Sequence, residues 1–272
     1  AFRANYFYNH YFQKFLWIVK KDSKEKISNL LKSISFIADK ESCLDLPDQV
    51  FITKKYDMNK SQLEAYNTML KENIAFVNNK SILGANELSK IMKLRQITSG
   101  FIFDNQGFSH TISDSKLNLL EETIEEIGNK QIIIWIQFIE DIFNIKKLLE
   151  RLNITYGILS SIFTQKDKDK TIKLFSEKDI QILIAHPKSG GYGLNLANCS
   201  YNIYYSIDYS YESEKQSQDR THRIGQINKV TYIYLLANKS IDEVIYKSLR
   251  KKQDISEAIL NMLQTKQEEI NA

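Results

Sequence analysis

Two arginines and a glycine-rich stretch are the residues whose types and spacing could do chemistry in this chain. Arg220 and Arg223 lie three positions apart in the run QSQDRTHRIGQ at 216–226. If this run is helical, positions three and four apart share a face, so Gln216, Arg220 and Arg223 point the same way. A guanidinium is permanently charged, and its planar fork matches phosphate oxygens. The pattern predicts a binding site for a chain of phosphates.

The glycine-rich stretch lies upstream of the arginines. Residues 189–196 read SGGYGLNL and follow an apolar run. Glycine lets a backbone approach a ligand closely and adopts positive φ. An ordinary turn between a strand and a helix explains this stretch when it is taken alone, but its place about 30 residues before the arginines favours a functional loop.

A plain alternative exists for the arginines. They could lie on a solvated helix and form salt bridges with Asp219, Glu212 or Glu214. His222 lies between them and is assigned no acid–base role. If the site is functional, Asp219 is expected to fix an arginine and Gln216 to orient a phosphate or an arginine.

Together the two segments resemble motifs V and VI of the Swi/Snf-type DNA-translocating ATPases, a branch of the superfamily-two helicases. That family carries a G-x-G-L-N-L loop and then Q-x-x-D-R-x-H-R-I-G-Q, which residues 220–226 match almost completely. The ending Gly225-Gln226 favours this branch over RNA helicases of the DEAD-box type. The resemblance runs in order over residues 40–265 and includes Leu94-Arg95-Gln96, Ser115-Lys116 and the apolar run 132–136.

The resemblance implies a set of site residues. Arg220 and Arg223 would act as arginine fingers that reach across a cleft to the γ-phosphate of ATP held by another lobe. The implied ATP-binding residues are Gly191, Gly193, Asn195, Gln216 and Asp219. The implied DNA-binding residues are Lys116, Gln137, Gly157, Lys168 and Ser189.

Plain alternatives remain for the DNA-binding residues. Gln137 and Gly157 are expected at the carboxyl ends of two strands, where ligands bind in parallel sheets. Lys116 could equally be an exposed lysine, and the charge run at 166–170 could be a solvated helix face.

Some family features differ or are missing. Family members often have an arginine near Lys168 and a tryptophan in a W-N-P segment where this chain has Tyr209 and Tyr211. The chain has no G-x-x-x-x-G-K-[ST] loop to cradle phosphates. Asp242-Glu243 imitates a D-E-x-H box in spelling but opens a helix. We therefore expect this chain to be a fragment that lacks the first motor lobe. The full-length protein is expected to bind ATP and Mg²⁺, and the fragment alone is expected to hold neither and to be inactive.

Composition sets wider limits. The chain has 272 residues, 43% of them hydrophobic, which is enough for a core. A net charge of +4 permits a nucleic-acid surface without requiring one. Cys43 and Cys199 form no metal-ligand spacing, which favours a reduced, cytoplasmic setting. No apolar run approaches the roughly 20 residues of a membrane span. The expected partners are double-stranded DNA and the missing N-terminal lobe, with no membrane.

The positioning elements follow from hydrophobic periodicity. From residue 113, helices and apolar strands alternate, which predicts a parallel sheet with helices on both faces, the RecA-like α/β layout that the resemblance also implies. The expected strands are 131–137, 155–159, 180–185, 201–207 and 230–236, and the expected helices between them cover 117–127, 138–152 and 166–175. Ahead of them we expect helices around 9–19 and 24–37, a strand at 50–56, helices from 59 or 61 and at 87–97, and a hairpin of 101–103 with 108–111.

Three parts are predicted. Residues 1–112 are expected to be the mainly helical end of the first lobe or a bridge between lobes, with a small hairpin. Residues 113–237 form the RecA-like lobe, and 238–272 a terminal helix packed on it, opened by a capping box of Ser240 and Glu243. The alternative to a motor half is a non-catalytic lobe that binds DNA or protein.

Overall fold

The computed structural model describes residues 2–9, 16–35, 44–72, 74–77, 80–84, 87–189, 194–251 and 258–259. The chain divides into two compact units, Ala1–Asp45 and Leu46–Ala272. Within the described ranges, no helix has the length and apolar character that crossing a membrane requires.

The first unit contains helices and a hairpin. Its elements are α1 (Phe2–Tyr6), β1 (Phe7–Asn9), β2 (Trp17–Val19) and α2 (Ser23–Ile34). The helix expected around 9–19 is wrong at its described ends, because Asn9 and Trp17 are partners in the antiparallel β1–β2 pair. Aromatic and β-branched residues such as those of 17–19 fit a pleated strand better than a helix.

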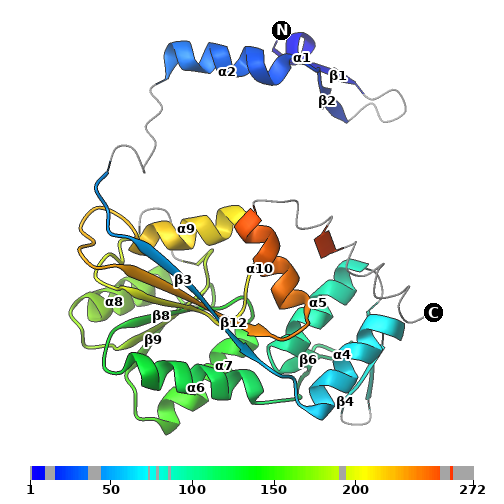
Figure 1. Cartoon of the computed structure of the whole chain (residues 1–272), viewed down its shortest axis with the longest axis vertical. Helices are drawn as coiled ribbons and strands as arrows, with labels where there is room; N and C mark the ends of the chain where they lie inside the picture. Colours follow the sequence, from blue (N-terminus) through cyan, green and yellow to red (C-terminus); the bar gives the residue numbers. More distant parts are fainter. Residues whose placement is uncertain are drawn as a thin grey trace. The chain divides into compact units, whose positions relative to one another are not determined.

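The second unit is built on a six-stranded sheet in which all pairs are parallel (Figure 1). The strand order is β3-β12-β11-β8-β10-β9. The strands are β3 (Gln49–Tyr56), β8 (Ile132–Trp135), β9 (Tyr156–Leu159), β10 (Ile182–Ala185), β11 (Tyr201–Tyr204) and β12 (Val230–Ala237). The predicted RecA-like α/β fold is confirmed.

Helices cover both faces of this sheet, and the two cores differ in chemistry. On one face, α6 (Ser115–Ile127) and α7 (Ile139–Arg151) pack mainly aliphatic side chains such as Leu120 and Ile145 against the strands. The other face is aromatic and includes Trp135, Tyr204 and Tyr234. The elements on this aromatic side include α8 (Gln165–Ser176), α9 (Tyr211–Thr221) and α10 (Ile241–Lys251).

The sheet extends beyond the predicted lobe of 113–237. The strand β3 pairs with β12 along its whole length, from Gln49 with Val230 to Tyr56 with Ala237. Between β3 and α6 the chain forms α4 (Lys60–Glu72), α5 (Glu87–Thr98) and two hairpins. These hairpins are β4 (Ile74–Val77) with β5 (Lys80–Leu83), and β6 (Phe101–Phe103) with β7 (Ser109–Thr111).

The start of α10 differs from a capping box. The Ser240 hydroxyl accepts a hydrogen bond from the Asp242 N–H at 3.2 Å. The Glu243 carboxylate accepts from the Lys239 N–H at 3.2 Å, one residue earlier than the predicted partner. Asp242 itself is buried, and its charge is paired with Lys116 as described below.

Candidate functional site

The helix that carries Arg220 buries a polar face. Ser210 caps the start of α9, where its hydroxyl accepts from the Ser213 N–H at 3.2 Å. The residues that α9 buries are Ser213, Glu214, Ser217, Gln218 and Thr221. A helix without an apolar face needs hydrogen bonds to hold it on a sheet, because each buried polar group left without a partner costs free energy.

Tyrosines of β11 and β12 supply those hydrogen bonds. The Tyr204 hydroxyl lies 2.5 Å from Ser217 Oγ, and the Gln218 amide donates to the Tyr234 hydroxyl at 3.3 Å. Tyr232 lies 3.1 Å from Thr221 Oγ1, and its burial raises its pKa to about 12, so it stays protonated. These hydrogen bonds from Tyr204, Tyr232 and Tyr234, called the tyrosine ladder below, fix which face of α9 packs on the sheet.

Arg220 lies between α9 and the segment that follows β10. Its Nη2 donates to the carbonyl of Pro187 at 2.7 Å, and its guanidinium carbon lies 5.7 Å from the centre of the Trp135 ring. Burial lowers the pKa of Arg220, but an arginine retains its charge at neutral pH. Its second terminal nitrogen, Nη1, is shielded from solvent and has no hydrogen-bond partner among the described residues.

Arg223 does not share a helical face with Arg220, which corrects the prediction. The helix ends at Thr221, and His222 is its C-cap with φ −94° and ψ 80°. The His222 ring bonds the Pro47 carbonyl at 2.8 Å, and Gly225 has a φ of 98°, so this segment is a turn. Arg223 nevertheless turns back, and its Nη1 donates to the Leu194 carbonyl at 3.4 Å.

The two arginines therefore meet carbonyls on both sides of the glycine-rich stretch. Pro187 precedes residues 190–193 and Leu194 follows them. Gly191 and Gly193 fall in that interval, outside the described residues. The plain alternative of carboxylate pairing is not what the described contacts show. Glu214 pairs with Arg250, while Asp219 lies 3.8 Å from Lys215.

The remaining predicted ATP-binding residues lie on α9 and just after the glycine-rich stretch, and Asp219 is half-buried. Gln216 and Asn195 are exposed. The Asn195 side-chain oxygen accepts from the Ala197 N–H at 3.1 Å, which shapes the turn after Leu194. Ser189, predicted to bind DNA, is half-buried and closes a turn with His186 at 2.9 Å.

Lys116 is neither an exposed lysine nor available to a ligand. Its side chain is buried, its Nζ lies 3.1 Å from Asp242 Oδ2, and it faces the Tyr205 ring at 5.4 Å. Thr98 also donates to Asp242, at 2.8 Å. This network joins α5, α6 and α10, so the structure gives Lys116 a place in the core.

Gly157 does not end its strand either. It is the second residue of β9 and is buried under α8. A Cβ at this position would lie 2.6 Å from Thr171 Cγ2 and 2.9 Å from Ile180 Cδ1. Only glycine therefore allows α8 to pack this closely, which is a packing reason for its presence.

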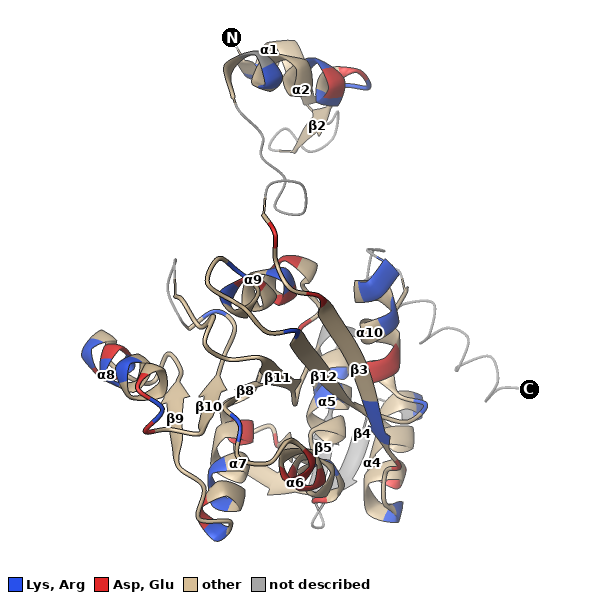
Figure 2. Cartoon of the chain, turned by 60° about the vertical axis from the view of Figure 1, so that its left-hand side comes forward, with Lys and Arg blue, Asp and Glu red and all other residues tan. Residues whose placement is uncertain are grey.

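The other two predicted DNA-binding residues remain near the surface. Gln137 follows β8 and is half-buried, and its N–H donates to Ser206 Oγ at 2.7 Å. Lys168 is half-buried on α8, where lysines alternate with Asp167 and Asp169 (Figure 2).

Sequence reasoning gave no role to a buried arginine, Arg95, that contacts the chain just after the carboxyl end of β11. Arg95 donates through Nη2 to the Ile207 carbonyl at 2.5 Å. Its guanidinium lies between the rings of Phe138, at 5.3 Å, and Tyr209, at 5.0 Å. Burial lowers the pKa of Arg95. The resemblance of Leu94-Arg95-Gln96 to the family pointed to this residue, but the sequence did not indicate which residues Arg95 contacts.

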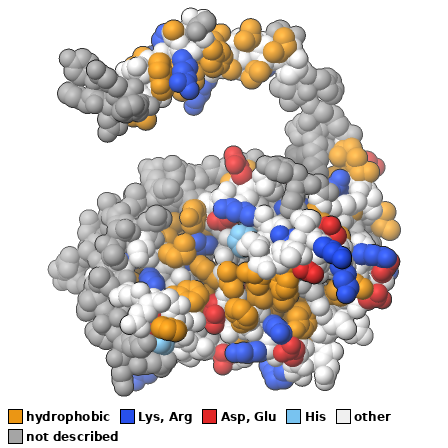
Figure 3. All heavy atoms as spheres, turned by 180° about the vertical axis from the view of Figure 1, so that it is seen from behind, with side chains coloured by type: hydrophobic (Ala, Val, Ile, Leu, Met, Phe, Trp, Pro, Cys, Tyr) orange, Lys and Arg blue, Asp and Glu red, His pale blue; other side chains and the backbone are white. Residues whose placement is uncertain are grey.

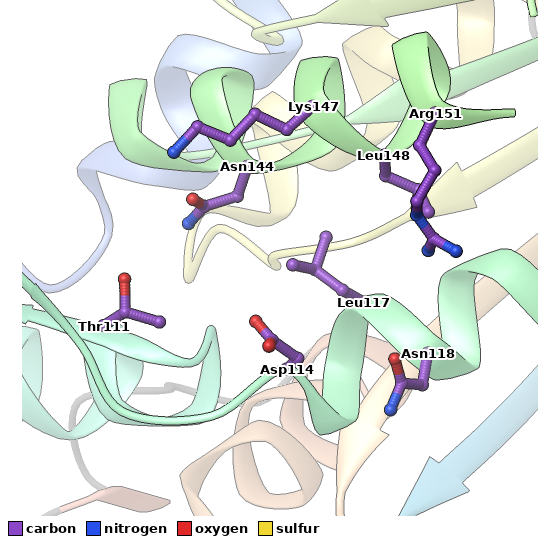
Figure 4. A pocket seen from close by; sticks show the side chains of 8 residues that line it. All are labelled: Thr111, Asp114, Leu117, Asn118, Asn144, Lys147, Leu148 and Arg151. Carbon is purple, nitrogen blue, oxygen red and sulfur yellow. The ribbon is translucent and has the colours of Figure 1, made fainter. Parts of the chain in front are cut away.

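A pocket of about 440 Å³ lies between α6 and α7, on the other side of the sheet from Trp135 and Arg220 (Figure 4). Leu117 of α6 and Leu148 of α7 line it from opposite sides, with Asn144 and Arg151 pointing from α7 toward α6. On the face in Figure 3, hydrophobic side chains gather in a central patch bordered by charged ones.

Within the described ranges, no group of three or more His, Cys, Asp or Glu residues could hold a metal ion.

Comparison with known proteins identifies the fold and the family. The sequence model for the helicase conserved C-terminal domain matches residues 115–225. The transcription regulatory protein SNF2 of Saccharomyces cerevisiae is 28% identical over 235 residues, which are 79% of this chain and 14% of that protein. These matches support a C-terminal helicase lobe of the Swi/Snf type.

Further relatives agree with this assignment. The nuclear protein STH1/NPS1 of the same yeast is 27% identical over 243 residues, which are 81% of this chain and 18% of that protein. The uncharacterized ATP-dependent helicase MG018 of Mycoplasma genitalium is 26% identical over 245 residues, which are 87% of this chain and 24% of that protein. The lobe therefore spans less than a quarter of the length of these relatives.

A solved structure shares the fold. The C-terminal part of the Fun30 ATPase domain matches with a TM-score of 0.59 at 19% identity, over 75% of the lobe and 89% of that chain. The matched family domain ends at residue 225, so β12 and α10 lie outside it.

Proposed function

We propose that the lobe is half of an ATP-dependent motor that moves along double-stranded DNA, and that Arg220 and Arg223 are its arginine fingers. The observation that carries this proposal is the buried Nη1 of Arg220, which has no partner among the described residues. Leaving such a donor unpaired costs about 1–3 kcal/mol. A phosphate oxygen would satisfy it with a charge-assisted hydrogen bond.

The surroundings of the two arginines fit this role. One terminal nitrogen of Arg220 is anchored to Pro187, so the fork has a defined direction and its Nη1 is left for a ligand. Arg223 is more loosely held, at 3.4 Å from the Leu194 carbonyl. Positive charge fixed in advance at the place where negative charge develops stabilises a phosphoryl-transfer transition state.

ATP would supply the phosphates, held chiefly by the first lobe. Gln216 and Asp219 lie on α9 with Arg220, and Asn195 lies just after the glycine-rich stretch. These three residues are proposed to contact ATP. Mg²⁺ ligands would come from the first lobe, since the described part of this chain offers no suitable cluster.

Contacts with DNA are proposed at the surface of α8 and at the strand ends. Lys168 and its exposed neighbours Lys166 and Lys170 present ammonium groups, and Gln137 and Ser189 follow strands β8 and β10. Such contacts with phosphates bind without sequence preference and weaken as salt rises.

The test uses the longer natural protein that contains this lobe and its first lobe. DNA-stimulated ATP hydrolysis is measured for the natural sequence and for Arg220→Ala and Arg223→Ala. Each change is expected to lower kcat by about 10³-fold or more while DNA affinity is kept. Arg151→Ala is the matched control, because Arg151 is exposed on the opposite face and pairs with Glu121. Unchanged hydrolysis in both arginine variants would contradict the proposal.

The same measurements distinguish the motor from a second candidate function, a non-catalytic lobe that binds DNA or protein. That reading expects salt-dependent DNA binding by the two-lobed protein with no ATP turnover and no effect of either arginine change. The 272-residue chain alone is expected to hydrolyse ATP negligibly in either case.

A further inference from the structure

A buried ion pair ties the helix of Arg220 to the C-terminal helix. Glu214 lies on α9, six positions before Arg220, and its carboxylate accepts hydrogen bonds from Arg250 of α10 and from the Tyr234 hydroxyl. Glu214 is 3% exposed, and burial raises its pKa even though Arg250 opposes this. The pair connects α9 with a helix outside the matched family domain.

Arg250 is itself held in one place. Its guanidinium carbon lies over three rings: Phe51 of β3 at 4.6 Å, Tyr234 of β12 at 5.4 Å and Tyr246 of α10 at 5.6 Å. Contacts with three rings restrict the planar cation, so its charge is presented to Glu214 from a fixed point.

Tyr234 connects this ion pair to the tyrosine ladder. Its hydroxyl contacts Glu214, receives the Gln218 amide at 3.3 Å and lies 3.3 Å from Arg250 Nη2. Glu214 and Gln218 are one helical turn apart, and Arg220 follows Gln218 by two residues. A shift of the Glu214 end along the sheet would therefore carry Arg220 with it.

We propose that Arg250 is a positioning residue for Arg220, so that α10 is a working part of the proposed ATP site and more than a terminal cover. The bonds between α9 and the sheet tyrosines are uncharged hydroxyl and amide bonds, each worth about 1 kcal/mol net. The Glu214–Arg250 pair is a buried ion pair between two helices, and breaking one partner of such a pair costs about 3–5 kcal/mol. This inference rests on the proposed function only for its catalytic consequence.

The decisive variant removes the charges without leaving one of them unpaired. Glu214→Gln combined with Arg250→Met keeps an acceptor for Tyr234 and fills the arginine site with an apolar side chain, which is often neutral for stability. Arg250→Lys keeps the charge and serves as the conservative variant if the double change does not fold. Lys55→Met is the matched control, because it breaks the 3.0 Å pair between α10 and β3 through Glu243 without touching α9.

Two measurements are made on these proteins. In the two-lobed protein, the double variant is expected to lower the kcat of ATP hydrolysis by about 10- to 100-fold with KM nearly unchanged, since small misplacement of a catalytic group mainly affects the transition state. Arg250→Lys should recover part of this loss, and Lys55→Met should behave as the natural sequence.

The second measurement is independent of catalysis. It uses the 272-residue chain, which has two tryptophans, so Trp17→Phe leaves Trp135, whose ring centre lies 5.7 Å from the Arg220 guanidinium carbon, as a local reporter. The double variant should shift the Trp135 emission and increase its quenching by acrylamide, and Lys55→Met should not. An unchanged kcat, or a lowered kcat with unchanged Trp135 emission, would overturn the positioning role. If the natural protein lacks ATPase activity, the proposed function fails, and the Trp135 signal still decides whether Arg250 places Arg220.

Discussion

Lys116 and Asp242, which are 126 positions apart in the chain, form a buried ion pair of 3.1 Å between the start of α6 and the start of α10. Asp242 also accepts hydrogen bonds from Thr98 and from the Ala237 N–H, at 2.8 and 3.2 Å. One carboxylate therefore fastens α5, α6 and the end of β12 to α10.

The first prediction concerns this pair. Lys116→Met should lower the free energy of unfolding by about 3–5 kcal/mol, because it leaves the buried Asp242 carboxylate without its cation. Urea unfolding measures the loss. Adding Asp242→Leu should recover most of it. A lysine that acted by touching DNA would instead weaken DNA binding and leave stability unchanged.

The second prediction concerns pH. Burial raises the pKa of Asp141 from its ordinary 3.8 to about 6, against the Ser206 hydrogen bond and the charge of Lys116. The folded state thus holds this proton more tightly than the unfolded state, and Asp141 costs stability as pH rises from about 4 to 6. Asp141→Asn should raise the free energy of unfolding at pH 8 by about 1–2 kcal/mol.

Unfolding midpoints of both proteins between pH 4.5 and 8 check this sign. The advantage of the Asn variant should shrink as the pH falls below about 6, because Asp141 then takes up a proton in the folded protein. A constant advantage across this range would show that Asp141 does not titrate there.

The third prediction separates packing from DNA contact at Gly157. Gly157→Ala should destabilise the lobe by about 1–3 kcal/mol, because the new Cβ would lie 2.6 Å from Thr171 Cγ2. Thr171→Ser removes that methyl group and should restore part of the stability in the double variant. Thermal unfolding of the four proteins gives the coupling, and additive effects would exclude the clash.

The fourth prediction is a trade between stability and activity. Arg220→Met removes a guanidinium whose Nη1 is buried without a partner among the described residues. In the two-lobed protein of the proposed function, the free energy of unfolding should stay the same or rise by up to about 2 kcal/mol, while the proposed DNA-stimulated ATP hydrolysis should be lost. Urea unfolding and ATPase assays on the same preparations make the comparison, and a marked loss of stability would show that Arg220 is structural.

Much of the sheet was predictable because its strands are short apolar runs between helices of clear periodicity. Residues 132–135 and 182–185 are fully buried strands, as apolar runs between helices predict. The helix expected around 9–19 failed at Asn9 and at 17–19, because aromatic residues there pair across a hairpin. A strand pairing of this kind depends on a distant partner that local periodicity does not reveal.

The candidate site was predictable in its residues and less so in its geometry. The spacing of Arg220 and Arg223 suited one helix, but the turn at His222 and Gly225 places Arg223 beyond its end. The polar face of α9 looked solvated, since the tyrosines that satisfy it come from β11 and β12. Lys116 and Gly157 acquired their roles from contacts with Asp242 and Thr171, which no local pattern encodes.

The place of β3 has a practical consequence for anyone who wants to express this lobe. A version that begins at residue 113 would lack β3, and the side of β12 that pairs with β3 would expose unpaired backbone amides and carbonyls along Val230–Ala237. Unpaired edge strands of this kind form hydrogen bonds with other chains and promote aggregation. The shortest version that keeps the border covered begins at or before residue 46, and it retains the helical insertion between β3 and α6.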